Sequence, residues 1–435
     1  MKLLRFALIV PLLAACQPGS SPPADPPGSG PLTLHRTTTG GWEFHRNGEP
    51  FFIRGAGGQS HLDVLAASGG NMIRTWGIDN LTEEQDGRTL VERARSHGLL
   101  ITAGIWVRHE RHGFDYGDPA QIQGQREEIR QAVARWKDEP AIAIWGLGNE
   151  MEGPTQDGRD VRIWKELEAL AGIIREEDPG RPIMTVIAGA GAAKVQGIKT
   201  HCPSIDILGV NAYSPAAEAG KAVKEAGWDK AFMLTEFGPL GHWEVPATPW
   251  GAPIEPGSRA KAAKYEDTQQ RVVRESQGLC VGTFAFFWGQ KQECTATWYG
   301  MFLESGEKLP AVDAMARAWT GEWPANRCPQ VESFTSPTGG QAVEPNQQIE
   351  VQLTVADPDG DPLALEWRIA PESTDRRVGG DKESAPPEFT VTMTALDDDR
   401  WTFHAPAQPG PYRLFLIARD GKGAASTENF PFLVR

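Results

Sequence analysis

Eight short apolar runs recur between residues 51 and 289, and they limit the folds open to this chain more than any other feature. Each run is rich in Val, Ile, Leu or Phe, and charged stretches with helical periodicity separate most of them. Continuous apolar strands that alternate with helices indicate a parallel sheet covered on both faces. The runs are FFIRGA (51–56), NMIRTW (71–76), LLITAGIWV (99–107), AIAIWGLG (141–148), PIMTVIAG (182–189), IDILGVNAY (205–213), AFMLTEFG (231–238) and GTFAFFWG (282–289).

Three of the charged stretches carry clear signals for a helix. The stretch 83–98 ends at Gly98, a residue that commonly follows the last helical turn. The stretch 118–138 opens with Asp-Pro, which combines a capping side chain with a proline in the first helical position. The stretch 160–180 closes on Asp-Pro-Gly just before the next apolar run. We therefore expect a helix over each of these three ranges.

Eight parallel strands with crossover helices close into a barrel, which typically needs about 250 residues. The sequence thus predicts an α/β fold, a (β/α)8 TIM barrel over residues 32–328, which opens with a β-hairpin at 32–55. An open, doubly wound parallel sheet is the competing arrangement.

The pattern changes after Cys328, where short alternating strands and turns fill residues 329–435. Such spacing predicts an all-β sandwich. The turn DPDGDPL, the strand to Trp367 and the closing YRLFLIARDGKG resemble immunoglobulin-like modules of bacterial surface proteins. The acidic segment ADPDGD (356–361) is read as a plain turn, with a Ca²⁺ site as the alternative. The module either binds polysaccharide or spaces and stabilises the barrel.

The last residues of the apolar runs are the candidates for chemistry, because active sites of such barrels lie where the strands end. Structural roles are the alternatives: Arg74 could form a salt bridge and Tyr213 could pack at the rim. The two glutamates are harder to explain this way, since a carboxylate that ends a buried strand loses hydration and needs partners. The residues at the strand ends are Arg74, Trp76, Trp106, Asn149, Glu150, Tyr213, Glu236 and Trp288.

Several of these segments resemble the large clan of retaining glycoside hydrolases built on (β/α)8 barrels, over most of residues 50–322. KDEPAIAIWGLGNE (137–150) resembles the clan's strand-four signature, TEFG (235–238) its strand-seven signature, and RTWG (74–77) the place of its arginine. YGMFLESGEKLPAVDAMARAWTG (299–321) resembles the last loop and helix of family 2 catalytic domains. The jelly-roll that precedes the barrel in family 2 is not seen, and the hairpin at 32–55 stands in its place. RTWG also resembles the β-glucanosyltransferases of family 72.

The resemblance implies roles for these residues. Glu150 would be the acid/base and Glu236 the nucleophile, and in retaining enzymes two such carboxyl groups lie about 5–5.5 Å apart. Two close carboxylates cannot both ionise cheaply, so the pKa of one rises. Asn149 would hold the 2-hydroxyl of the sugar, Arg74 and Tyr213 would hydrogen-bond Glu236, and Trp288 would stack on the sugar ring. The expected substrate-binding residues are Arg74, Trp106, Asn149, Tyr213 and Trp288.

The first residues are expected to be a targeting segment rather than part of the fold. Residues 1–16 combine Lys2 and Arg5 with an apolar stretch and small residues, which is typical of a signal peptide. Its end, Leu-Ala-Ala-Cys, resembles the lipobox of bacterial lipoproteins, which implies lipidation at Cys16. Gln17 in the next position implies the outer membrane in a Gram-negative cell. An ordinary secretory signal is the alternative, and the Pro-rich segment 17–31 reads as a tether.

The other cysteines and the net charge restrict the remaining chemistry. Cys202, Cys280, Cys294 and Cys328 would permit two disulfides in an exported chain, but their spacing fixes no pairing. A net charge of −14 without a basic block argues against a nucleic-acid partner. His109 and His112 lack a carboxylate at metal-ligand spacing, so they are expected to line the cleft as loop residues. The expected chemistry requires no metal or cofactor.

Together these features predict a lipid-anchored, retaining glycoside hydrolase of the cell envelope that acts on a β-linked polysaccharide or oligosaccharide. The Trp-rich rim favours endo action on a β-glucan. Two alternatives stay open. One is a transglycosylase that uses the same two glutamates, and the other is a non-catalytic polysaccharide-binding lipoprotein.

Overall fold

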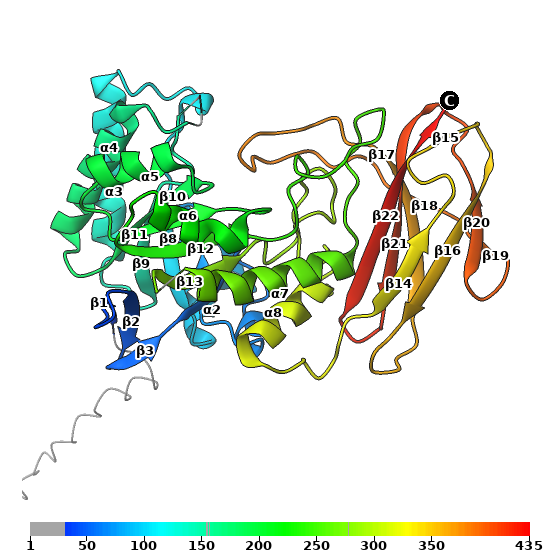
Figure 1. Cartoon of the computed structure of the whole chain (residues 1–435), viewed down its shortest axis with the longest axis horizontal. Helices are drawn as coiled ribbons and strands as arrows, with labels where there is room; N and C mark the ends of the chain where they lie inside the picture. The colour runs from blue at the N-terminus through cyan, green and yellow to red at the C-terminus, as the bar shows by residue number, and fades with distance from the viewer. Residues whose placement is uncertain (1–30, 154, 156, 277) are drawn as a thin grey trace, which may run out of the picture.

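Eight parallel strands close into a barrel in the computed structural model, which describes residues 31–435 apart from 154, 156 and 277 (Figure 1). Each strand pairs with the next barrel strand in the chain, and the last pairs with the first. The closed sheet confirms the predicted barrel and excludes the open, doubly wound sheet. The strands are β4 (Ile53–Gly57), β5 (Met72–Arg74), β8 (Leu100–Ile105), β9 (Ile142–Leu147), β10 (Ile183–Ala188), β11 (Ile207–Asn211), β12 (Ala231–Phe237) and β13 (Cys280–Ala285).

Helices surround the barrel, and two of them begin where the sequence signals place them. The side chain of Asp118 caps α3 with a proline in the first turn, and Asp160 caps α4. The helices predicted over 118–138 and 160–180 are thereby confirmed. The set comprises α1 (Leu62–Ala67), α2 (Leu90–Ser96), α3 (Pro119–Trp136), α4 (Val161–Glu177), α5 (Ala192–His201), α6 (Ala219–Glu225), α7 (Ser258–Glu275) and α8 (Pro310–Thr320).

The helix predicted over 83–98 is wrong in its first half. Residues 84–89 form a small hairpin of β6 (Glu84–Gln85) and β7 (Arg88–Thr89), which turns at Asp86 and Gly87 with positive φ. The helix begins only after Thr89, whose hydroxyl and Glu92 form a reciprocal capping box. The Asp-Gly turn therefore prevails over the helical periodicity of the charged residues around it.

A three-stranded sheet covers the end of the barrel where the strands begin. It consists of β1 (Leu32–Arg36), β2 (Trp42–Arg46) and β3 (Glu49–Phe51). Phe44 is fully buried and packs with the first residues of the barrel strands, such as Met72 and Leu100. Because the sheet covers this end of the barrel, an active site is expected at the opposite end, where the strands finish.

Residues after 329 form two facing sheets, as expected for a β-sandwich. A separate apolar core, which includes Ile349, Trp367 and Phe432, fills the space between them. The assignment as immunoglobulin-like stays a prediction. One sheet contains β14 (Gln330–Thr335), β16 (Gln348–Ala356), β20 (Arg400–His404) and β19 (Thr394–Ala395), and the other β15 (Ala342–Val343), β22 (Ala425–Val434), β21 (Gly410–Arg419), β17 (Ala364–Pro371) and β18 (Phe389–Thr390).

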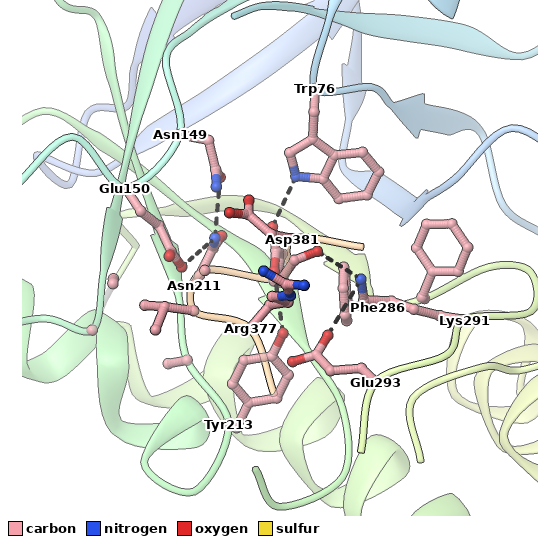
Figure 2. Close-up of a pocket in the computed structure, with 18 of the residues that line it drawn as sticks. Trp76, Asn149, Glu150, Asn211, Tyr213, Phe286, Lys291, Glu293, Arg377 and Asp381 are labelled. Carbon is pink, nitrogen blue, oxygen red and sulfur yellow. Dashed lines mark hydrogen bonds and ion pairs between the residues drawn. The ribbon is translucent and has the colours of Figure 1, made fainter. Parts of the chain in front are cut away.

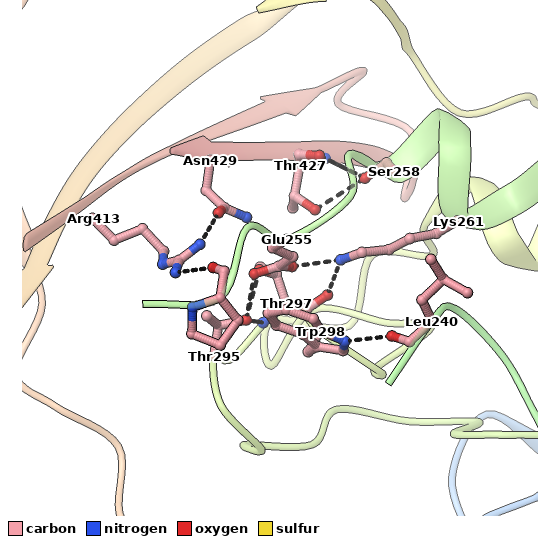
Figure 3. A network of polar contacts seen from close by, with 11 residues as sticks. Leu240, Glu255, Ser258, Lys261, Thr295, Thr297, Trp298, Arg413, Thr427 and Asn429 are labelled. Carbon is pink, nitrogen blue, oxygen red and sulfur yellow. Dashed lines mark hydrogen bonds and ion pairs between the residues drawn. The ribbon is translucent and has the colours of Figure 1, made fainter. Parts of the chain in front are cut away.

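The sandwich stands beside the barrel, and a buried polar network joins the two (Figures 1 and 3). Arg413 on β21 is 1% exposed and donates to the Pro253 carbonyl, at 2.7 Å, and to the Glu372 carboxylate. Ser258, at the start of α7, exchanges hydrogen bonds with Thr427 on β22. Buried, mutually satisfied polar groups fix a single docking geometry.

Four cysteines and an acidic turn lie within the described residues. Cys202, Cys280, Cys294 and Cys328 are all free, so the two permitted disulfides do not form. Asp357, Asp359 and Asp361 bring carboxylate oxygens within 4.8 Å of one another, and the Nζ of Lys422 lies 2.6 Å from Asp361. The predicted signal peptide, 1–16, lies outside the described residues, as does the tether except for Pro31. Within the described ranges, no helix has the length and apolar character needed to cross a bilayer.

Candidate active site

A pocket of about 800 Å³ opens at the end of the barrel where the strands finish (Figure 2). Side chains that follow β9, β11, β12 and β13 meet there, although they are far apart in the sequence. Glu150 and Glu236 both line this pocket, as do Trp106, Asn149 and Tyr213.

Glu236 occupies the buried side of the pocket, near the end of β12, and its side chain is 8% exposed. Three donors converge on its carboxylate. Arg74 Nη1 lies 2.9 Å from Oε1, Trp76 Nε1 lies 3.1 Å from the same oxygen, and the Tyr213 hydroxyl lies 3.1 Å from Oε2. A carboxylate that accepts three hydrogen bonds, one of them from a guanidinium, is held in one orientation with its charge compensated.

Arg74, the last residue of β5, ties Glu236 to the loop after β9. Its guanidinium also donates to the Asn149 Oδ1, at 2.6 Å, and to the Thr235 carbonyl, at 3.0 Å. Arg74 is 2% exposed and does not line the pocket, so it positions Glu236 and Asn149 rather than contacting a bound ligand.

Glu150 follows β9 in a backbone conformation that is rare for residues other than glycine. Its φ is +55°, and Gly148, two positions before it, has φ +72°. A hydrogen bond from the Glu150 amide to the Val186 carbonyl, at 2.9 Å, holds this turn. Residues other than glycine that adopt this left-handed conformation cluster at functional sites, where the surrounding fold enforces the conformation.

The surroundings of the Glu150 carboxyl favour its protonated form. Burial and the nearby carboxylates of Glu236 and Glu152 raise its pKa to about 7, while a hydrogen bond from Asn211 opposes the rise. Asn211, the last residue of β11, donates to Glu150 at 2.9 Å and to Asn149 at 3.2 Å. The Glu150 carboxyl thus carries a proton near neutral pH, while the neighbouring Glu236 carboxylate accepts hydrogen bonds from three donors.

Aromatic side chains form the rim of the pocket. Burial raises the pKa of Tyr213 well above its ordinary value, so the phenol keeps its proton and donates to Glu236. Trp243, in the long loop after β12, packs edge-on against Tyr213 and is 60% exposed, and Trp106 is 38% exposed. Exposed indole faces beside a polar pocket suit the apolar face of a sugar ring.

The structure thus brings together most of the residues singled out at the strand ends. Glu150, Glu236, Asn149, Tyr213 and Trp106 line one pocket, and Arg74 contacts two of them from behind. The catalytic and binding roles assigned to them stay predictions.

Trp288 is the exception, and its predicted stacking on substrate is wrong. Strand β13 ends at Ala285, so Phe286 and Phe287 line the pocket instead. Trp288 is 1% exposed, packs against Phe302 and Trp319, and donates its indole N–H to the His61 carbonyl at 3.1 Å.

Trp288→Ala should therefore act on stability rather than on substrate binding. Removal of a buried indole is expected to lower the free energy of unfolding by about 3–5 kcal/mol. Trp243→Ala is the matched comparison, because its exposed indole lines the pocket and should change KM with little effect on stability. Chemical denaturation and steady-state kinetics of both variants would check this; an unchanged unfolding midpoint for Trp288→Ala would contradict it.

Some pocket residues did not emerge as site residues from the sequence. Trp76 stood among the strand ends without an assigned role, and Asn211 lies two positions before Tyr213 in the same run. Both could have been found by asking which polar groups end each strand. Arg377 and Asp381 come from the sandwich and line the pocket as well, and no local pattern links them to the barrel.

The comparisons with known proteins agree with this geometry in the barrel. Residues 93–236 match the family model for the TIM barrel domain of glycosyl hydrolases family 2, and the matched stretch contains Glu150 and ends at Glu236. A β-galactosidase of Aeromonas hydrophila is 28% identical over 162 residues, which are 33% of this chain and 14% of the relative. The chain thus spans a small part of this curated relative.

Solved structures share the fold at low sequence identity. A β-glucuronidase of Bacteroides uniformis aligns with a TM-score of 0.50 at 13% identity, over 93% of this chain and 48% of that one. Bacteroides uniformis β-glucuronidase 2, solved covalently bound to cyclophellitol-6-carboxylate aziridine, aligns with a TM-score of 0.51 at 13% identity over the same shares of the two chains.

Proposed function

We propose that this chain is a retaining O-glycosyl hydrolase that cleaves a β-linked polysaccharide or oligosaccharide. One observation carries the proposal: two glutamates face the same pocket, where burial and nearby carboxylates raise the pKa of Glu150 and three donors converge on the carboxylate of Glu236. The match of residues 93–236 to a glycosyl hydrolase barrel supports it, and so do the names of the relatives, which are β-galactosidase and β-glucuronidase.

The two carboxyl groups divide the work of a double displacement. Glu150 donates its proton to the glycosidic oxygen while the Glu236 carboxylate attacks the anomeric carbon, so the leaving group departs and a glycosyl ester forms. Glu150, now a carboxylate, then takes a proton from water as that water attacks the same carbon. Glu236 leaves as a carboxylate, and the sugar is released with its original anomeric configuration.

Positioning residues supply the remaining parts. Asn149 lines the pocket and is held at its Oδ1 by Arg74 and Asn211, which supports its assignment to the sugar 2-hydroxyl. The exposed indoles of Trp106 and Trp243 support a β-glucan as substrate, because glucose units present flat apolar faces.

A product analysis tests the proposed function. The soluble chain from about residue 30 would be incubated with aryl β-glycosides and with β-1,2-, β-1,3-, β-1,4- and β-1,6-linked polysaccharides. Products would be sized, and their anomeric configuration would be followed by proton NMR. Retained configuration in shorter products supports the proposal. Inverted configuration contradicts it, products longer than the substrate indicate a transglycosylase, and binding without turnover indicates a polysaccharide-binding lipoprotein.

We also propose that the protein is anchored by a lipid at Cys16, in the outer membrane. The Leu-Ala-Ala-Cys sequence before a polar, Pro-rich tether supports this. Cys16→Ser should leave the protein uncleaved or soluble, without the added lipid mass. Fractionation and intact mass of the two forms would check it, and unchanged membrane recovery and mass would contradict it.

A further inference from the structure

One wall of the pocket comes from the sandwich rather than from the barrel. The connection between β17 and β18 (372–388) leaves the sandwich and extends over the barrel, where it is drawn in orange in Figure 1. Its residues 377–381, called the bridge below, line the same pocket as Glu150 and Glu236. Figure 2 shows Arg377 and Asp381 in the middle of the site, between Trp76 and Tyr213.

The bridge is fastened at one end to the loop after β8. Asp381 accepts from His112 Nε2, at 2.9 Å, and lies 3.4 Å from Arg111 Nη2. Gly379, with φ +69°, packs against the same guanidinium, so that a Cβ there would lie 2.9 Å from Arg111 Nη2. These contacts join positions about 270 residues apart in the sequence.

The bridge and the residues that follow it are also fastened to the loop after β13. Lys291 Nζ donates to the Gly380 carbonyl at 2.9 Å. The Glu383 side chain, 2% exposed as a residue, accepts from the Cys294 amide at 2.7 Å and from the Arg377 amide at 3.0 Å. Since the loops after β8 and β13 flank those after β4 and β5 in the barrel, the bridge spans the pocket on the β4–β5 side.

The first residue of the β17–β18 connection, like the bridge itself, is held by polar contacts. Glu372, where the connection leaves β17, pairs with Arg413, which also donates to the Pro253 carbonyl of the barrel. Figure 3 shows the hydrogen bond from Arg413 to Asn429 on β22. Nearby, Glu255 and Lys261 form a buried ion pair at 2.5 Å. The bridge is therefore a fixed part of the pocket wall rather than a free loop.

The positions of the two glutamates tell which part of a substrate meets the bridge. An acid that protonates the glycosidic oxygen lies on the side of the leaving group. Glu150 hydrogen-bonds to Val186 on β10 and to Asn211 at the end of β11, and pocket residues follow both strands, so the leaving group departs toward β10 and β11. The sugar attacked by Glu236 then lies on the other side, toward Trp76 and the bridge.

We propose, on the basis of the proposed function, that the bridge forms the wall that binds the sugar unit attacked by Glu236. Asp381 and Arg377 are its hydroxyl-binding groups. The bridge also restricts the enzyme to the terminal sugar units of a chain. A carboxylate accepts from sugar hydroxyls and a guanidinium donates to their oxygens. A chain that continued beyond that unit would run into the bridge. This opposes the endo action expected from the Trp-rich rim.

The charge state of Asp381 fits the role of an acceptor. Burial by itself would raise its pKa, but the hydrogen bonds from His112 and Arg111 outweigh that effect and hold the pKa below its usual value. Asp381 thus meets a ligand as a carboxylate over the neutral range.

Variants of the bridge test this assignment. Asp381→Ala removes the acceptor and the fastening to His112, whereas Arg377→Gln removes a donor and leaves that fastening intact. Each should lower kcat/KM on an aryl β-monosaccharide about tenfold, mainly through KM, which is the loss expected for one charged hydrogen bond. On an oligosaccharide ladder, the unaltered protein should release single sugars, and Asp381→Ala should also release longer products.

The matched control is Asp397→Ala, which removes a similarly exposed sandwich carboxylate that is paired with Arg400 at 2.5 Å outside the pocket. Bridge variants with the kinetics and products of this control would overturn the assignment, as would interior cleavage by the unaltered protein. If the unaltered protein cleaves no aryl glycoside and no polysaccharide, the proposed function itself fails, and the bridge assignment falls with it. Thermal unfolding of each variant separates lost binding from lost folding.

Discussion

Replacement of Glu236 with glutamine is expected to lower kcat by at least ~10⁴-fold, the order of loss seen when a covalent nucleophile is removed. The amide cannot attack the anomeric carbon, yet it nearly keeps the shape of the carboxylate. Arg74, Trp76 and Tyr213 would still surround it, so substrate affinity should change much less than kcat. Turnover of an aryl β-glycoside, with binding measured separately by calorimetry, would check both parts of this prediction.

Glu166→Gln provides the matched control for this experiment. Glu166, on α4, is 4% exposed and pairs with Arg126 at 2.6 Å, so its substitution also leaves an arginine without its carboxylate partner. It lies outside the pocket, however, and kcat should stay near that of the unaltered protein. The assignment of Glu236 would be contradicted if Glu236→Gln kept kcat within tenfold, or if the two variants lost activity equally.

The barrel could be predicted because its signal is local and repeated. Each strand is buried on both faces and therefore reads as a continuous apolar run, and the capping side chains of Asp118 and Asp160 mark the starts of two crossover helices. Strand ends follow from the same runs, so Glu150 and Glu236 could be assigned to one rim before their partners were known.

The errors arose where a single position decided the outcome. The sequence pattern placed Trp288 at the end of a strand that stops three residues earlier, at Ala285. Beyond the strand, the indole of Trp288 packs against Trp319 on α8. Three bulky residues, Phe286, Phe287 and Trp288, follow Ala285 in this run, and periodicity does not tell which of them leave the strand. The hairpin at 84–89 was missed for a similar reason, since a two-residue turn interrupts an otherwise helical pattern.

The bridge lay beyond sequence reasoning for a different reason. The contacts of the β17–β18 connection join Asp381 to His112 and Glu383 to Cys294, and neither pair shares any pattern in the sequence. The connection reads as an ordinary polar loop between two strands of a sandwich. Only the docking of the two domains, fixed by Arg413 and its partners, brings it over the pocket.

Loss of activity at alkaline pH is the second large effect that the site predicts. Glu150 must carry a proton to assist the leaving group, and burial together with Glu236 and Glu152 raises its pKa to about 7. The protonated fraction, and kcat/KM with it, should therefore be full well below pH 7 and fall tenfold per pH unit well above it. A carboxyl with an ordinary pKa would instead lose its proton near pH 4.5.

Two substitutions separate this explanation from a general loss of folding at high pH. Glu150→Gln should lower kcat/KM by about 10²–10⁴-fold on substrates with poor leaving groups and by much less on dinitrophenyl glycosides, and it should lack the alkaline limb associated with Glu150. Glu152→Gln removes one of the negative charges that raise the pKa of Glu150, so its alkaline limb should move toward lower pH while activity at acidic pH persists. If the loss of activity near pH 7 persists in Glu150→Gln, the titration belongs to another group, because this variant has no Glu150 proton to lose.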